Sequence, residues 1–222
     1  RIVRLSFLIG ILACGADAVA THAVIDTDAG AVDASSEADA SDSPTPVDAG
    51  PRASLHVLFV GNSYTYVNDV PAILARIAET APAGPRIETE AVVEGGFGLE
   101  SHLMKGDAQR RIAEKTWTHV VLQGQSLEPT KPDYFLPFAK QIADLVVDAG
   151  ARPTWFVTWA RAPSEGAYPI EPEKRIAFTS PDELQDRLTS AYDEAARRAP
   201  GSLLACVGEA FRTSLRAHPE LT

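Results

Sequence analysis

A serine follows an apolar run near residue 60, in a setting that suits nucleophilic chemistry. The run Leu55–Val60 continues into Gly61, Asn62 and Ser63, and a helical pattern begins shortly afterwards. A serine on a sharp turn between a buried strand and a helix exposes its hydroxyl, and its backbone N–H can point into the same space. Ser63 is therefore a candidate nucleophile for acyl transfer, although Gly-Asn-Ser is also an ordinary composition for a polar turn.

Residues that could stabilise an oxyanion follow two further apolar runs. Gly95 and Gly96 follow the second run, and glycine lets a backbone N–H approach a ligand closely. Gln123, Gln125 and Ser126 follow the third, where an amide side chain can donate to a developing oxyanion without becoming charged. The alternatives are a flexible glycine loop and a polar cap on a strand end.

The fourth apolar run leads into a long loop. Trp159 and Arg161 open it, and the segment continues past Tyr168 to Thr179. Loops of this length in compact domains often carry function, so Trp159 and Arg161 are candidate substrate-binding residues, with a surface excursion as the alternative. His102 could act as a base, but its place after the second loop favours a packing or surface role on a helix.

The elements that must position these residues alternate between apolar runs and helical patterns. This alternation is typical of an α/β domain with a parallel sheet, in which ligands bind beyond the carboxyl ends of the strands. We expect a doubly wound, flavodoxin-like, five-stranded parallel sheet with helices on both faces, a three-layer α/β/α domain over Ser54–Thr222. The predicted strands are Leu55–Val60, Ile87–Val93, His119–Gln123, Pro153–Thr158 and Leu203–Val207, and the predicted helices are about Val70–Ala81, Asp107–Lys115, Tyr134–Ala149, Pro181–Arg198 and Glu209–Ala217.

Local signals mark several helix boundaries. Asp69 is expected to cap the first helix, and Gly150 to end the third in a left-handed conformation. Ser180, Pro181 and Glu183 form a capping box with proline at the first helical position.

Two segments precede the domain. Arg1–Cys14 has basic residues before an uncharged run that is too short to span a bilayer, and its end resembles a bacterial lipobox. We expect a signal peptide, export, and a membrane anchor through lipid on Cys14, with an ordinary secretory signal or the start of a buried helix as the alternatives. Gly15–Ala53 is rich in Ala, Asp, Ser and Pro and lacks aromatic residues, so it is expected to be a disordered linker.

Composition excludes some classes of function. The formal net charge of −10 argues against nucleic-acid binding, which needs a clustered basic face. The two cysteines, Cys14 and Cys206, do not suggest a disulfide framework, and Cys206 is expected to be a buried thiol in a strand. The spacing of Cys, His and Asp matches no metal-site pattern, so no metal or cofactor is expected.

Three of these motifs together resemble the conserved blocks of SGNH, or GDSL-like, serine hydrolases, in particular an acetylesterase-like branch. Val57–Ser63 is similar to the first block, Gly95-Gly96 with its following residues to the second, and Val120–Ser126 to the third. The resemblance implies that Ser63 is the nucleophile and that the backbone N–H groups of Ser63 and Gly96, or Gly95 instead, form the oxyanion hole. It leaves open whether Gln123, Gln125 or Ser126 completes that hole.

The sequence departs from the pattern of these hydrolases at three places. Asn62 stands where the first block usually has Asp, and Ser126 where the third usually has Asn. No Asp-x-x-His, the block that supplies the general base, occurs in the sequence, and we expect it after Thr222, so that residues 1–222 alone would hydrolyse esters poorly.

The resemblance predicts a serine esterase acting on a small-molecule or glycan ester, with an O-acetylated carbohydrate as the suggested substrate. The alternative is a non-catalytic domain that binds glycan or cell wall through Trp159, Arg161 and Tyr168.

Overall fold

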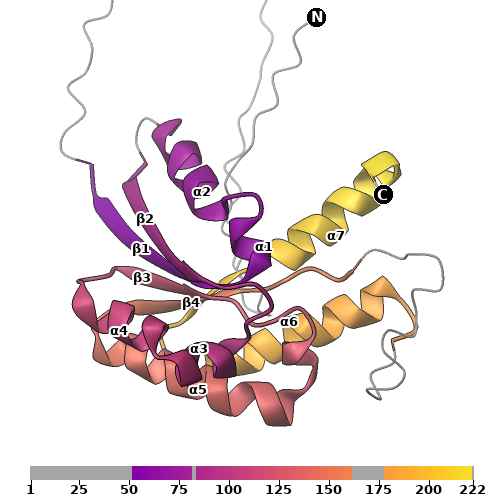
Figure 1. Cartoon of the computed structure of the whole chain (residues 1–222). Helices are drawn as coiled ribbons and strands as arrows, with labels where there is room; N and C mark the ends of the chain where they lie inside the picture. The colour runs from indigo at the N-terminus through magenta and orange to yellow at the C-terminus, as the bar shows by residue number, and fades with distance from the viewer. Residues whose placement is uncertain (1–51, 82–83, 162–177, 222) are drawn as a thin grey trace, which may run out of the picture.

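The computed structural model describes residues 52–81, 84–161 and 178–221, which form one domain around a parallel sheet (Figure 1). Its five strands lie in the order β2-β1-β3-β4-β5, and every neighbouring pair is parallel. This is the flavodoxin-like order, and it confirms the predicted fold class. The strands are β1 (Ser54–Gly61), β2 (Arg86–Val93), β3 (His119–Leu122), β4 (Arg152–Phe156) and β5 (Leu203–Ala205).

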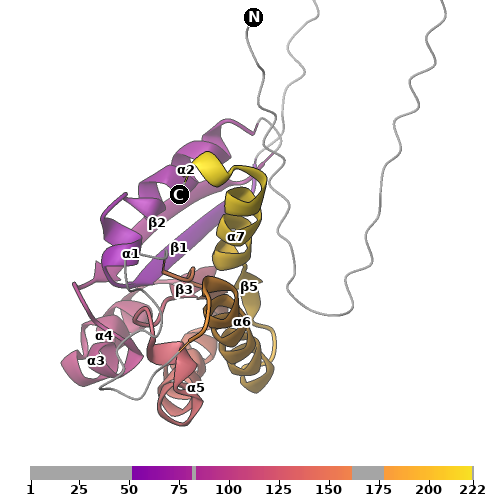
Figure 2. The ribbon, with the colours of Figure 1, turned by 90° about the vertical axis from the view of Figure 1, so that its right-hand side faces the viewer.

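Helices cover both faces of the sheet, as the three-layer prediction requires. The face that carries α2 and α7 lies opposite the face that carries α3, α4, α5 and α6 (Figures 1 and 2). In the described part of the chain, no helix is both long and apolar enough to cross a membrane. The helices are α1 (Ser63–Tyr66), α2 (Val70–Glu79), α3 (Leu99–Lys105), α4 (Asp107–Glu114), α5 (Pro132–Asp148), α6 (Pro181–Arg198) and α7 (Val207–Ala217), with 3-10 turns η1 (Glu128–Thr130) and η3 (Pro219–Leu221).

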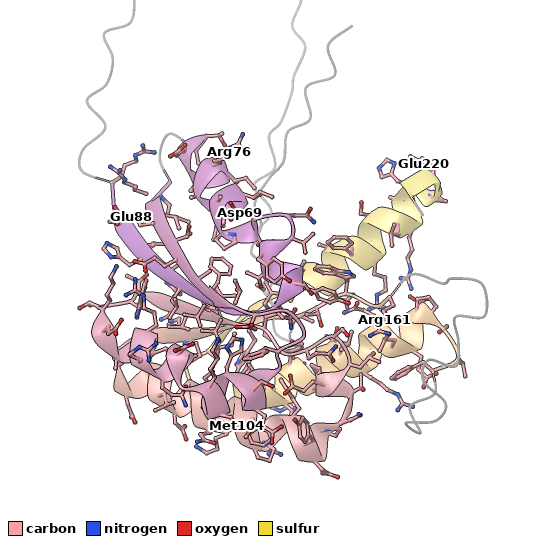
Figure 3. The ribbon with its side chains drawn as sticks, viewed as in Figure 1. Asp69, Arg76, Glu88, Met104, Arg161 and Glu220 are labelled. Carbon is pink, nitrogen blue, oxygen red and sulfur yellow. The ribbon has the colours of Figure 1, made fainter. Side chains whose placement is uncertain are left out.

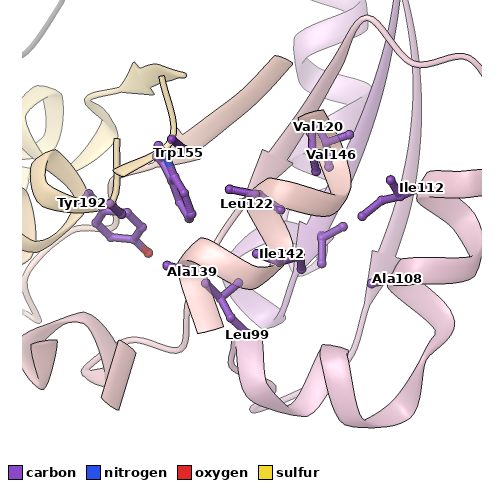
Figure 4. Close-up of a cluster of buried hydrophobic side chains, with 14 of the residues drawn as sticks. Leu99, Ala108, Ile112, Val120, Leu122, Ala139, Ile142, Val146, Trp155 and Tyr192 are labelled. Carbon is purple, nitrogen blue, oxygen red and sulfur yellow. The ribbon is translucent and has the colours of Figure 1, made fainter. Parts of the chain in front are cut away.

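The sheet separates two apolar layers, because successive side chains of a strand point to opposite faces. Leu58 and Leu122 belong to the larger layer, which α3 to α6 complete (Figure 4). Phe59 and Phe156 belong to a smaller cluster on the face of α2 and α7. Burial of this apolar surface is the main favourable contribution to folding, and it fixes the strand ends at which the site forms.

The predicted helix caps form. The Asp69 carboxylate accepts from the Ala72 N–H at 3.3 Å, and Gly150 has φ 78° after α5. The Ser180 hydroxyl oxygen accepts from the Glu183 N–H at 3.1 Å. The return bond of the capping box differs from the usual pattern, because the Glu183 carboxylate accepts from the N–H of Thr179 at 2.8 Å.

The structure corrects several predicted elements. The short helix α1 was not predicted. For α3, a helix containing His102 was expected, but its first and last residues were not predicted. β5 ends at Ala205, two residues earlier than expected, so Cys206 is a half-exposed residue at the start of α7 and not a buried strand thiol. The predicted signal peptide, Cys14, nearly all of the linker, and Tyr168 lie outside the described residues.

Candidate functional site

Ser63 lies at the turn between β1 and α1, as its sequence context predicts. β1 ends at Gly61, Asn62 is extended, and Ser63 is the first residue of α1. Ser63 is half-buried, and its hydroxyl forms no hydrogen bond with any residue that the structure describes. Its backbone N–H, in the first turn of a helix, has no partner within that helix. A hydroxyl without a hydrogen-bond partner among the described residues and a backbone donor are therefore combined in one residue.

Asn62 fixes this turn with all of its side-chain hydrogen-bonding capacity. Its Oδ1 accepts from the Tyr64 N–H at 3.1 Å and from Gln123 Nε2 at 2.9 Å. Its Nδ2 donates to the carbonyl of Phe97 at 2.8 Å and to that of Gly124 at 3.3 Å. Asn62 thus ties the Ser63 turn to the loops that follow β2 and β3, and both donors would be lost in an ionised aspartate.

The side-chain amide of Gln123 also forms hydrogen bonds that hold the turn. Its Oε1 accepts from the Asn62 N–H at 3.2 Å and from the Thr65 hydroxyl at 2.7 Å. Its Nε2 donates to Asn62 Oδ1 and to the Gly124 carbonyl, the latter at 2.8 Å. Because both amide hydrogens have acceptors and the side chain is buried, the structure places Gln123 in the scaffold beneath Ser63.

The loop after β2 brings Gly96 to the same edge of the sheet. The Glu94 N–H donates to the carbonyl of Gly61 at 3.2 Å, and Asn62 holds the carbonyl of Phe97. Gly96 has φ 76°, a left-handed conformation in which a side chain would be strained. The candidate oxyanion glycine therefore sits in a loop bonded directly to the serine turn.

Gln125 and Ser126 lie after β3, next to Arg161. Gln125 Nε2 donates to the Ser126 hydroxyl oxygen at 2.9 Å, and Arg161 Nη2 donates to the same oxygen at 3.0 Å (Arg161 is labelled in Figure 3). Gln125 Oε1 accepts from the Leu127 N–H at 3.1 Å. The Gln125 amide nitrogen carries two hydrogens and has one acceptor, Ser126, among the residues that the structure describes, so it retains donor capacity that Gln123 lacks.

Trp159 is sandwiched between two other aromatic rings. Tyr64 stacks on it with centroids 4.5 Å apart, and Phe211 of α7 stacks on it at 4.7 Å. Both faces of the indole are therefore covered, and a substrate would meet the edge of Trp159 or the outer rings. Since Tyr64 follows Ser63 directly, the stack begins beside the serine turn.

His102 is a packing residue, as its sequence position favours. Its side chain is 2% exposed, Nε2 lies 2.8 Å from the Gly61 carbonyl, and the ring meets Phe97 edge-on. Because a carbonyl accepts only, the contact requires a proton on Nε2. Burial lowers the pKa of His102 below its ordinary 6.5, so the imidazole supports the turn in its neutral form.

Acid is expected to destabilise the domain through His102. A histidine whose pKa is lower in the folded than in the unfolded state contributes stability above pH of about 6.5, and that stability is lost as the pH falls below this value. We predict that His102→Gln, whose amide can still donate to Gly61, gives a shallower fall in the free energy of unfolding between neutral pH and about pH 5. Urea denaturation of the wild type and the variant at several pH values measures this pH dependence.

The matched control for that series is His218→Gln. His218 is exposed after α7, with Nδ1 3.2 Å from Glu220, which Figure 3 labels at the far end of that helix. An equal slope in the His102→Gln variant and the wild type would contradict the assignment to His102.

Sequence reasoning missed some of the residues that build this site. Thr65 bonds to Gln123, and the hydroxyl oxygen of fully buried Tyr192 accepts from the Gly124 N–H at 3.0 Å. Buried Glu128, the first residue of η1, is a further one. Thr65 follows the serine closely and could have been suspected, whereas Tyr192 lies more than sixty residues away in a helix and carries no local signal.

Comparisons with known proteins agree with the fold. Neither the models of known families nor the curated proteins give a match. Among solved structures, a protein from Slackia heliotrinireducens assigned as an SGNH hydrolase is 27% identical, with a TM-score of 0.59 over 72% of this chain and 83% of that one. The acetyl xylan esterase AlAXEase is 14% identical, with a TM-score of 0.55 over 75% and 84%.

A third solved structure, of the esterase AlinE4, is 12% identical, with a TM-score of 0.51 over 78% of this chain and 84% of that one. The last two likenesses concern the fold, whereas the first extends to the sequence. Together with a serine turn at the carboxyl edge of a flavodoxin-like sheet, the first likeness supports a hydrolase of the SGNH type. The chain has the fold of the SGNH, or GDSL-like, hydrolases and shares 27% sequence identity with a protein assigned to them.

Proposed function

We propose that this protein is a serine esterase in which Ser63 attacks the carbonyl carbon of an acyl ester. The observation that carries the proposal is the state of Ser63. Its hydroxyl has no hydrogen-bond partner in the described part of the chain, while the residues on either side are held by a buried amide network. The side chains around Ser63 make hydrogen bonds that hold the turn in place, whereas the Ser63 hydroxyl is not used in any of them. This arrangement suits a nucleophile, which has to be accurately placed and yet available to react.

The oxyanion that forms on attack would be stabilised by three donors. Two are the backbone N–H groups of Ser63 and Gly96, which lie in bonded loops at one edge of the sheet. For the third we propose the Gln125 amide, because the hydrogens of Gln123 are already bound. Each such donor is typically worth about 10²- to 10³-fold in kcat.

The general base is proposed to be the histidine of an Asp-x-x-His segment, as in the hydrolases that the chain resembles. It would take the proton of Ser63 during attack and return it to the leaving alcohol, after which water hydrolyses the acyl-enzyme. His102 does not suit this role, since its Nε2 is bound to the Gly61 carbonyl in a buried site.

For the substrate we propose an O-acetylated carbohydrate or a similar small ester. The acetyl xylan esterase among the structural neighbours supports this class, and the rings around Trp159 with the nearby cation of Arg161 suit a sugar. We also propose export and a lipid anchor at Cys14, for which the acyl mass on Cys14 of the mature protein is the measurement.

The experiment that tests the function is covalent labelling. A fluorophosphonate added to the full-length native protein should react within minutes, and peptide mass spectrometry should place the adduct on Ser63. Heat-denatured protein is the control, because an unassisted serine is a weak nucleophile. Glycan binding by a native protein that resists labelling would instead support the non-catalytic alternative.

A further inference from the structure

A buried carboxylate joins two of the loops that carry the proposed oxyanion donors. Glu128 is the first residue of η1, after β3, and is only 6% exposed. The proposed reaction assigns it no chemical step. In the described part of the chain it is the one acidic residue among the buried polar and charged side chains.

The Glu128 carboxylate accepts hydrogen bonds from both loops. From the loop after β2 and its helix, the Leu99 N–H donates to the two carboxylate oxygens at 3.1 and 3.3 Å. From the loop after β3, the Gln125 N–H donates at 2.8 Å. The carboxylate thus bridges the segment just after Gly96 to the residue proposed as third donor.

The space around this carboxylate is closed on both sides by glycine. A Cβ at Gly98 would lie 2.5 Å from a Glu128 oxygen, and one at Gly124 would lie 2.9 Å from the same oxygen. Side chains at these positions would push Glu128 away, since real Cβ atoms keep larger distances from oxygen. The two loops and the carboxylate therefore fit as one unit.

Placing a carboxylate here is costly, which argues that its acceptor capacity is needed. Burial raises the pKa of Glu128, and the N–H groups of Gln125, Leu99 and Glu100 oppose that rise. Buried N–H groups without an acceptor would cost stability, and a carboxylate offers acceptors only. An amide in its place would direct an N–H at one of these donors.

We propose that Glu128 is a positioning residue, which holds the Gly96 loop and the Gln125 loop at the separation that the oxyanion requires. The inference rests on the proposed esterase function. Glu128 contacts the backbone of the donor loops and acts through them on the transition state. Misplacing donors weakens binding of the transition state more than that of the substrate, so the effect belongs in kcat.

The test is steady-state hydrolysis of p-nitrophenyl acetate by the full-length protein and its Glu128→Gln variant. We expect kcat to fall about 10- to 100-fold, and KM to change less than about threefold. Circular dichroism and urea denaturation confirm that the variant is folded. Glu128→Asp keeps the charge but is one methylene shorter, so it should also lose kcat, and it replaces the Gln variant if that protein does not fold.

The control is Ile142→Val, which thins the core at fully buried Ile142 of α5 without touching either loop. It should lose stability and keep its kcat. A folded Glu128 variant with the wild-type kcat overturns the positioning role, as does an equal loss of kcat in Ile142→Val. Absence of Ser63-dependent turnover in the wild type would instead overturn the proposed function, and this role with it.

Discussion

Replacing Ser63 by alanine is expected to abolish ester hydrolysis in the full-length protein. The nucleophile cannot be substituted by its neighbours, because Asn62 and Gln123 are held in hydrogen bonds and Tyr64 is stacked on Trp159. Loss of the nucleophile in serine hydrolases lowers kcat by about 10³- to 10⁶-fold, and the remaining donors give only residual catalysis. Initial rates with p-nitrophenyl acetate measure the change.

The control for this substitution is Ser190→Ala. Ser190 is an exposed serine of α6, and its loss should leave both rate and stability unchanged. The fold should also survive Ser63→Ala, because the Ser63 hydroxyl bonds to nothing in the described residues. Hydrolysis by Ser63→Ala at the wild-type rate would rule out Ser63 as the nucleophile.

A second large effect, on stability, is expected from Asn62→Asp. This substitution introduces the residue that is usual at this position in the hydrolases that the chain resembles. The carboxylate could still cap α1 through the Tyr64 N–H. It would, however, face the carbonyl oxygens of Phe97 and Gly124 without a hydrogen to donate. Two lost buried hydrogen bonds and a buried charge should lower the free energy of unfolding by about 3 kcal/mol or more near neutral pH.

Urea denaturation of Asn62→Asp and of the matched variant Asn68→Asp measures this effect. Asn68 is exposed in the turn after α1, so its substitution should change stability by less than about 0.5 kcal/mol. Equal stabilities for the two variants would show that the bonds from Asn62 to Phe97 and Gly124 do not hold the loops. Esterase activity should fall with stability in Asn62→Asp, because the same bonds place Ser63.

The architecture was predictable because its determinants are local or periodic. Apolar runs such as Leu55–Val60 are typical of strands buried on both faces, and their alternation with helical patterns favours a parallel sheet. The caps at Asp69 and Gly150 depend on side-chain and backbone chemistry within a few residues. The ends of short elements were less predictable, and β5 stops at Ala205 because pairing with β4 ends there.

The sequence by itself also determined which residues gather at the site, since the carboxyl ends of parallel strands share an edge. On that ground Ser63, the pair Gly95 and Gly96, and the group Gln123, Gln125 and Ser126 could be named as candidates, without a choice within the pair or the group. Only the tertiary structure decided what each amide does: Gln123 lies beneath the turn, whereas Gln125 keeps a hydrogen to donate. The role of the buried Glu128 carboxylate was also decided only by the tertiary structure. A charge is stable in the interior only when hydrogen-bond donors surround it, and folding brings the backbone N–H groups of Leu99 and Gln125 to this carboxylate from separate loops.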